Sequence, residues 1–228
     1  MTEMRVAELW RYPVKSLAGE RLEATELTMT GIPGDRIVQV RDDRVILTAR
    51  THPRLLGLRA TLGSDGEPRV NGLPWMAPEV ANAIRAAAGL SARLVRDDSA
   101  ERFDVLPLLV ATDGAIGHLG VDRRRFRPNI LIEGVEHLAE REWPGRCFRI
   151  GEAIIGVKKR RGRCVMTTYD PDTLEQDLSV LHRVVREMEG RLGLDCYVIR
   201  SGRLAVGDRV VMLAGERGRA ETQVSRSP

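Results

Sequence analysis

Residues 148–173 read FRIGEAIIGVKKRRGRCVMTTYDPDT and combine a strong strand signal with a distinctive cysteine. Two short apolar runs flank Gly151-Glu152, a pattern typical of a β-hairpin. Five of the six residues at 158–163 are cationic, and Cys164 follows them directly. Nearby positive charge favours the thiolate, which is both a nucleophile and a metal ligand. Taken alone, the cysteine also fits a small buried hydrophobic residue beside a strand.

Short apolar segments before this stretch predict a chain made mostly of strands. Helix 78–88 is expected because Pro78 begins it and Gly89 follows its end. The regular spacing of the apolar segments, with Gly, Pro or Asp between them, favours an antiparallel barrel or sandwich. The expected strands are residues 6–10, 22–29, 37–40, 45–48, 55–62 and 93–96.

The second half predicts further strands and two helices. A helix from Thr112 or Asp113 to about residue 119 follows the apolar run 105–111. A longer helix, 178–192, carries apolar residues at helical spacing, which indicates core packing. The remaining strands are 129–133, 148–150, 153–157, 196–200 and 210–213.

These elements predict a mixed, mostly β fold with a few helices. The chain falls into a first half, residues 1–96, and a second half, residues 97–213, and its length fits one large domain or two small ones. Residues 214–228 are polar and rich in small side chains, which predicts a disordered tail.

Composition narrows the function classes. The chain has 228 residues, 43% of them hydrophobic, and a net charge of +4. No apolar run is long enough to span a membrane and the first residues lack a signal sequence, so a cytoplasmic protein without a membrane partner is expected. Three widely spaced cysteines make neither a disulfide framework nor a Cys-x-x-Cys site. Aromatic residues are only 4%, which makes nucleic-acid binding unlikely.

Six short motifs occur in one order along the chain. They are WRYPVKSL at 10–17, GDR at 34–36, TAR at 48–50, FRPNI at 126–130, RC at 163–164 with TTYDPDT at 167–173, and VGD at 206–208. In this order the chain resembles the MOSC-domain proteins with the N-terminal β-barrel domain that often precedes MOSC. The resemblance covers roughly residues 5–213. It implies an N-terminal β-barrel-like domain at residues 1–96, packed with a β-barrel MOSC domain at residues 97–213. It is strongest to the mitochondrial amidoxime-reducing components and bacterial reductases of N-hydroxylated compounds.

The resemblance implies a molybdenum–molybdopterin cofactor between the two halves, with Cys164 as the metal ligand. A soft thiolate suits a metal that is already held by sulfur. Asp170 is implied as a catalytic proton donor or a group near the metal, although Asp before Pro171 is equally typical of a turn. The implied cofactor contacts are Lys15, Ser16, Arg36, Thr112, Arg127 and Asn129.

The chain also departs from the family pattern. Relatives usually have Gly at the position of Leu174, often Ser at Gly162 and usually Val at Tyr169. These differences affect the substrate side of the implied site more than its cofactor side.

The implied function is reduction of N–O bonds in small N-hydroxylated molecules. Since the chain lacks the cysteines of an iron–sulfur domain, it would need a separate electron-donor protein, ferredoxin- or cytochrome-like. The alternative is a sulfur or molybdenum-cofactor carrier that uses a Cys164 persulfide. A third hypothesis, a basic barrel that binds nucleic acid, is supported only by the positive charge of the chain.

Overall fold

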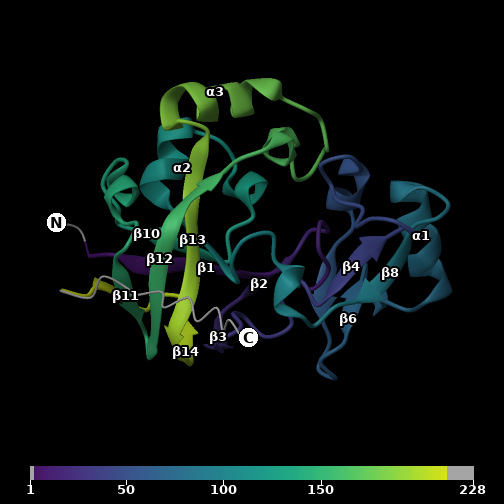
Figure 1. Ribbon diagram of the computed structural model, residues 1–228, viewed down its shortest axis with the longest axis horizontal. Helices are drawn as coiled ribbons and strands as arrows, with labels where there is room; N and C mark the ends of the chain where they lie inside the picture. Colours follow the sequence, from purple (N-terminus) through teal and green to yellow (C-terminus); the bar gives the residue numbers. More distant parts are fainter. Residues whose placement is uncertain (1–2, 215–228) are drawn as a thin grey trace, which may run out of the picture.

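The computed structural model describes residues 3–214, which form a larger and a smaller lobe side by side (Figure 1). Residues 215–228, nearly all of the predicted tail, lie outside the described residues. Strands dominate and three α-helices occur within residues 3–214, so the predicted mixed, mostly β fold class is confirmed. None of the helices in this part of the chain is both long and apolar enough to cross a bilayer.

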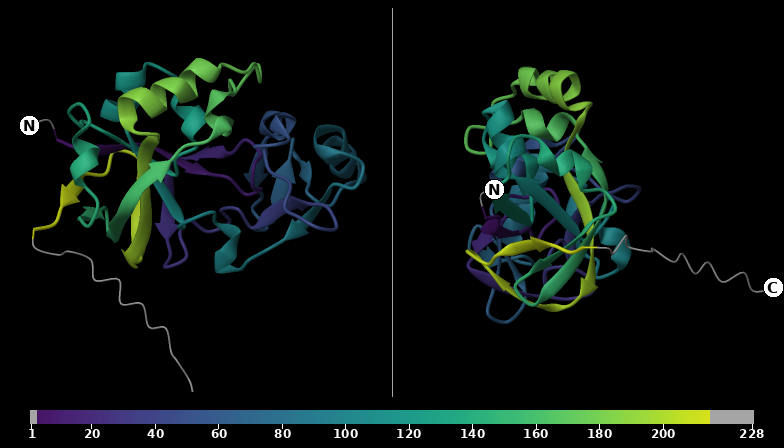
Figure 2. Two further views of the ribbon diagram at one scale, coloured as in Figure 1. Left: turned by 45° about the horizontal axis from the view of Figure 1, so that its top comes forward. Right: turned by 90° about the vertical axis from the view of Figure 1, so that its left-hand side faces the viewer.

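The larger lobe is built on one curved sheet of eight strands (Figure 2). The spatial order is β15-β11-β12-β13-β9-β10-β1-β2, and β9 and β10 run parallel. A second ribbon pairs β3 with β14, and its Leu27 and Leu204 help to fill the core. The bounds are β1 Arg5–Arg11, β2 Glu20–Leu22, β3 Ala24–Leu27, β9 Leu108–Thr112, β10 Ile130–Glu133, β11 Cys147–Ile150, β12 Ala153–Gly162, β13 Arg191–Arg200, β14 Gly202–Ala205 and β15 Val210–Met212.

The smaller lobe has a hydrophobic core of its own. Leu17, Leu55 and Ile84 are fully buried there, the last of them on a helix whose predicted range is confirmed. Strand β4 pairs with β8, and β5, β6 and β7 form a separate three-stranded sheet. The bounds are β4 Val38–Arg41, η1 Pro53–Gly57, β5 Ala60–Leu62, β6 Pro68–Val70, β7 Leu73–Pro74, α1 Pro78–Ala88, β8 Arg93–Arg96 and η2 Ala100–Arg102.

A third cluster packs helices over one face of the large sheet, with α3 above α2 in Figure 1. Val180, Val184 and Met188 of α3 are buried, whereas Leu178 and Val185 of the predicted apolar stripe are exposed. The apolar face that α3 buries is therefore narrower than the sequence predicted. The bounds are α2 Asp113–Leu119, η3 Arg123–Phe126, η4 Ala139–Glu142, η5 Val165–Thr168 and α3 Leu178–Met188.

The helix predicted at 178–192 is four residues too long. Glu189 and Gly190 take positive φ values of 58° and 73°, a conformation that ends a helix. The chain then enters β13 at Arg191, five residues before the strand predicted there. Strand β12 is longer than predicted as well, because pairing with β13 carries the cationic run as far as Gly162.

Three strands predicted in the first half of the chain differ from the structure. Residues 45–48 form no strand, because the Asp42 carboxylate accepts the Arg44 and Val45 amides, each at 2.7 Å, and closes a turn. Residues 55–62 begin as a 3-10 turn after Pro53 and become a strand only at Ala60. Residues 22–29 are divided between β2 and β3.

The first strands of the chain belong to the larger lobe. β1 pairs with β10, and β3 pairs with β14. The hydrophobic cores therefore cross the predicted boundary between residues 96 and 97: Val6, Leu9 and Leu27 pack with residues of the second half. The division into 1–96 and 97–213 stays a prediction about sequence domains.

Candidate functional site

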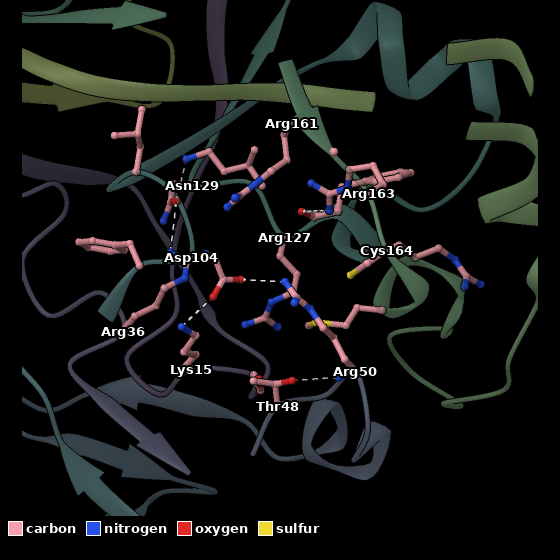
Figure 3. Close-up of a pocket in the computed structure, with 18 residues that line it drawn as sticks. Lys15, Arg36, Thr48, Arg50, Asp104, Arg127, Asn129, Arg161, Arg163 and Cys164 are labelled. Atoms are coloured by element: carbon pink, nitrogen blue, oxygen red, sulfur yellow. Dashed lines mark hydrogen bonds and ion pairs between the residues drawn. The ribbon is translucent and has the colours of Figure 1, made fainter. Parts of the chain in front are cut away.

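A cavity lies between the two lobes, and segments far apart in the chain line it (Figure 3). The smaller lobe contributes the loop after β1 and residues 48–50. The larger lobe contributes the end of η3, Arg127 and Asn129, and the segment from the end of β12 to Met166 in η5. Of the predicted site residues, the structure brings Lys15, Ser16, Arg36, Arg127, Asn129 and Cys164 together here.

Cys164 lies between the end of β12 at Gly162 and the start of η5 at Val165. Its side chain is half-buried, and Figure 3 shows the sulfur directed into the cavity. The other two cysteines, Cys147 and Cys196, are buried in the core of the larger lobe. In residues 3–214 no three or more His, Cys, Asp or Glu side chains are arranged to hold a metal ion.

The cavity wall is strongly cationic. Asp104 is its one acidic side chain among the described residues. Burial would raise the pKa of Asp104, but the hydrogen bond and charge of Lys15 hold it below its usual value. Such an excess of fixed positive charge favours an anionic ligand. The basic residues are Lys15, Arg36, Arg50, Arg125, Arg127, Arg161 and Arg163.

Two of these arginines keep their charge free for a ligand. Within residues 3–214, no carboxylate lies within ion-pair distance of Arg127 or Arg163. Arg127 stacks on the Tyr12 ring at 4.2 Å, and Arg163 donates to the carbonyl of Phe126 at 2.7 Å. The Nε of Arg163 is buried without a hydrogen-bond partner. Burial lowers the pKa of both guanidinium groups to about 10, so they remain cationic at neutral pH.

The other cations are held by carboxylates and shape the wall. Lys15 pairs with Asp104 at 2.7 Å and donates to the carbonyl of Arg102 at 3.0 Å. Arg161 contacts the fully buried Asp195 at 3.1 Å. These pairs fix the positions of the charged groups, as in preorganised anion sites.

Asn129 and Asp35 join the two lobes beneath the cavity. The Asn129 amide oxygen accepts from the Leu109 amide at 3.1 Å, and its Nδ2 donates to Asp35 at 3.2 Å. Asp35 also accepts the Tyr12 amide at 2.7 Å and pairs with Arg36. The Ser16 hydroxyl accepts the Ala49 amide at 3.1 Å. Asn129 and Ser16 thus line the cavity mainly as anchors of its wall.

Thr112, a predicted cofactor contact, lies outside the cavity. It is the N-cap of α2: its Oγ1 accepts the Ala115 amide at 3.2 Å and donates to Glu140 at 2.6 Å. Since the side chain is fully buried and both hydrogen bonds are internal, Thr112 stabilises a helix start.

Asp170 also does not line the cavity, and it is a turn residue. Backbone hydrogen bonds from Thr173 and Asp172 lower its pKa below the usual value. Its other oxygen accepts from Arg125 at 2.9 Å. A carboxylate held ionised in this way is a poor proton donor at neutral pH, which argues against the predicted acid role.

The cofactor contacts predicted from the sequence did not include Arg125. This residue lines the cavity and donates to the Thr168 carbonyl at 2.9 Å. Individual roles for Arg161 and Arg163 were missed as well. The sequence contained a signal for these two residues, namely the cationic run at 158–163. This run follows β12 to the cavity, and its last residues line the cavity wall.

Matches to known families agree with this architecture. Residues 108–211 match the MOSC domain, and residues 3–100 match the MOSC N-terminal beta barrel domain. The two matches together cover most of the described residues. The chain therefore belongs to the MOSC-domain proteins that carry this N-terminal domain.

Among curated proteins, the chain is 26% identical to mitochondrial amidoxime reducing component 2 of Macaca fascicularis, over 90% of this chain and 82% of that protein. It is 25% identical to mitochondrial amidoxime-reducing component 1 of Homo sapiens, over 74% and 67%. Molybdenum cofactor sulfurase of Caenorhabditis elegans is 24% identical over 77% of this chain and 30% of its own length. Among solved structures, the YUAD protein from Bacillus subtilis matches with a TM-score of 0.49 and 15% identity, over 92% and 97%.

Proposed function

We propose that this protein binds a molybdenum–molybdopterin cofactor in the cavity between its lobes and reduces N–O bonds of small N-hydroxylated molecules. One observation carries the proposal: a thiol and two arginines without carboxylate partners face the same cavity. The names of the curated relatives support the same chemistry.

The residues present fit such a cofactor. Cys164 would be the protein's ligand to the metal, whose other ligands come with the cofactor. Arg127 and Arg163 would hold the phosphate of the pterin, since a guanidinium donates two parallel hydrogen bonds to an oxyanion. The buried Nε of Arg163, which has no partner in the protein, supports an acceptor at this position.

The bound group would supply two-electron oxygen-atom chemistry, while the protein supplies orientation and charge. Reducing an N-hydroxyl group takes two electrons and two protons and releases water. Because Asp170 is held ionised, we infer that water reaching the cavity delivers the protons. The electrons would come from a separate donor protein.

The test is molybdenum content per chain, measured by elemental mass spectrometry on protein from a host that makes the cofactor. We expect near-stoichiometric metal in the wild type and a clear loss in Cys164→Ala. Arg163→Gln should also lose cofactor. The exposed Arg146→Gln is its matched control and should not.

Two outcomes would contradict the proposal. One is wild-type protein free of molybdenum while a known molybdenum enzyme from the same host is loaded. The other is loaded protein that reduces no amidoxime with any of several electron donors. A stable persulfide on Cys164 after incubation with a cysteine desulfurase, without metal, would favour the carrier alternative.

A further inference from the structure

A second hollow adjoins the cavity, and the proposed function gives it no role. We call it the arginine–aromatic cleft. It lies between the lobes and shares Arg125, Arg127 and Met166 with the cavity wall. Its volume of about 490 Å³ is in the range of small-molecule sites.

One wall of the cleft is aromatic. Trp10 lies in β1 and Tyr12 follows its end, two residues further along, with ring centroids 6.4 Å apart and planes 16° from parallel. Tyr12 is buried, and its hydroxyl donates to the Pro128 carbonyl at 3.1 Å, which fixes the ring. Tyr169 lines the cleft from the larger lobe. Flat, fixed rings of this kind favour a planar ligand.

The rim of the cleft is cationic. Arg21 lies directly opposite Trp10 in the β1–β2 pairing, and Arg59 follows from the smaller lobe. Within residues 3–214, neither of these side chains nor Arg127 has a carboxylate at ion-pair distance. The cleft's acidic residue, Asp172, is already bound by Arg124 through two hydrogen bonds of 2.8 and 2.6 Å.

We infer that the arginine–aromatic cleft binds a planar aromatic ligand that carries an anionic group. The ring would lie against Trp10, because Arg127 already covers the buried Tyr12 ring at 4.2 Å, and the anionic group would face Arg21 and Arg59. Because the cleft and the Cys164 cavity share a wall, such a ligand is placed beside the thiol. The inference that this ligand is the substrate rests on the proposed function. The inference that the cleft binds it does not.

The test uses three probes of similar size on the full-length protein, by isothermal titration at low ionic strength. Benzoate is planar and anionic, benzamide is planar and neutral, and cyclohexanecarboxylate is anionic but not planar. We expect saturable binding of benzoate, with both other probes weaker by about tenfold, the ratio that one charged hydrogen bond supports.

Variants test whether benzoate binds in the arginine–aromatic cleft. Arg21→Gln combined with Arg59→Gln should weaken benzoate about tenfold, because both residues line the cleft but not the cavity. Lys15→Gln is the matched control, since Lys15 lines the cavity but not the cleft. Thermal melting temperatures of all variants check that each remains folded.

Three results would overturn the inference. They are no saturable binding of benzoate, equal binding of benzamide, or a loss of benzoate binding in Lys15→Gln but not in the double variant. In molybdenum-loaded enzyme, a carboxylated aromatic amidoxime should have a lower KM than its uncharged parent, and the double variant should remove that difference. If the enzyme proves inactive, the titration still decides the binding claim.

Discussion

A single buried amide, that of Asn129, connects four parts of the molecule. Besides Leu109 and Asp35, its side chain donates to the Trp10 carbonyl at 3.3 Å, and Arg36 approaches its oxygen at 3.4 Å. The residue is fully buried. Removing the amide therefore leaves several buried polar groups without partners, which is costly.

We predict that Asn129→Ala lowers the free energy of unfolding by about 2–4 kcal/mol, measured by urea denaturation. The exposed Asn82→Ala on α1 is the control and should change it by less than about 0.5 kcal/mol. An Asn129 variant as stable as the wild type would mean that this network does not hold the lobes together.

Local sequence patterns identified individual cavity-lining residues only where a short motif contains a residue of the cavity wall. Lys15, Arg127 and Cys164, which short motifs singled out, all line the cavity, while their roles stay predictions. Thr112 does not line the cavity and caps α2, a position that a hydroxyl after an apolar strand suits equally well. The pairing of Arg161 with Asp195 joins residues 34 positions apart, which no local pattern reports.

At the scale of elements, helix α2 depends on its cap. Thr112 and Glu140 form a buried link in which Glu140 also accepts the Gly193 amide of β13 at 3.1 Å. The start of a helix, a 3-10 turn and a central strand are thus held by one carboxylate. Longer elements such as α1 were predicted well because Pro and Gly mark both ends, whereas β12 and β13 were predicted too short because pairing between strands sets their length.

We predict that Thr112→Ala destabilises the protein by about 1–2 kcal/mol, the usual cost of losing an N-cap, while Thr112→Ser keeps most of the stability. Circular dichroism melts measure this. Under the proposed function, molybdenum content should be the same in both variants. Selective loss of metal in Thr112→Ala at unchanged stability would restore the cofactor role.

Glu140 makes stability depend on pH. Burial raises its pKa above the ordinary value of 4.5 despite the Thr112 and Gly193 hydrogen bonds. The folded protein therefore holds the proton more tightly than the unfolded chain, and this stabilisation is fully present below pH 4.5 and lost as pH rises through the folded-state pKa.

Glu140→Gln cannot ionise, so we expect wild-type stability relative to this variant to fall as pH increases from 4.5 towards neutrality. Urea denaturation at several pH values measures the difference. The exposed Glu142→Gln on the same turn is the control. A constant difference across this range would show that Glu140 does not titrate differently in the folded state.

At the scale of the whole molecule, the two lobes are not two consecutive pieces of chain. β1 occupies an inner position in the large sheet, between β10 and β2, and the backbone of Val6 donates to Asp208 at 2.9 Å. The sequence predicted two β domains in order. It did not predict this exchange, because the pairing of β1 with β10 joins residues more than a hundred positions apart.

We predict that a fragment of residues 97–228 does not fold alone, since it lacks β1, β2 and β3. Near-ultraviolet circular dichroism should show no fixed aromatic packing. Co-expression with residues 1–96 should restore it, because the missing strands return in trans. A fragment that folds by itself would mean that the first three strands are dispensable for the larger lobe.

The inner position of β1 also sets an order of events during synthesis. Strand β1 leaves the ribosome before the smaller lobe is made, and its partner β10 follows only after that lobe is complete. The smaller lobe, whose buried core residues lie between Val14 and Ala92, can become compact in the meantime. Until β10 emerges, β1 presents an unpaired edge on the nascent chain. Rapid translation of residues 97–130 would shorten that exposure, and a pause there would lengthen the time in which chaperones must shield it.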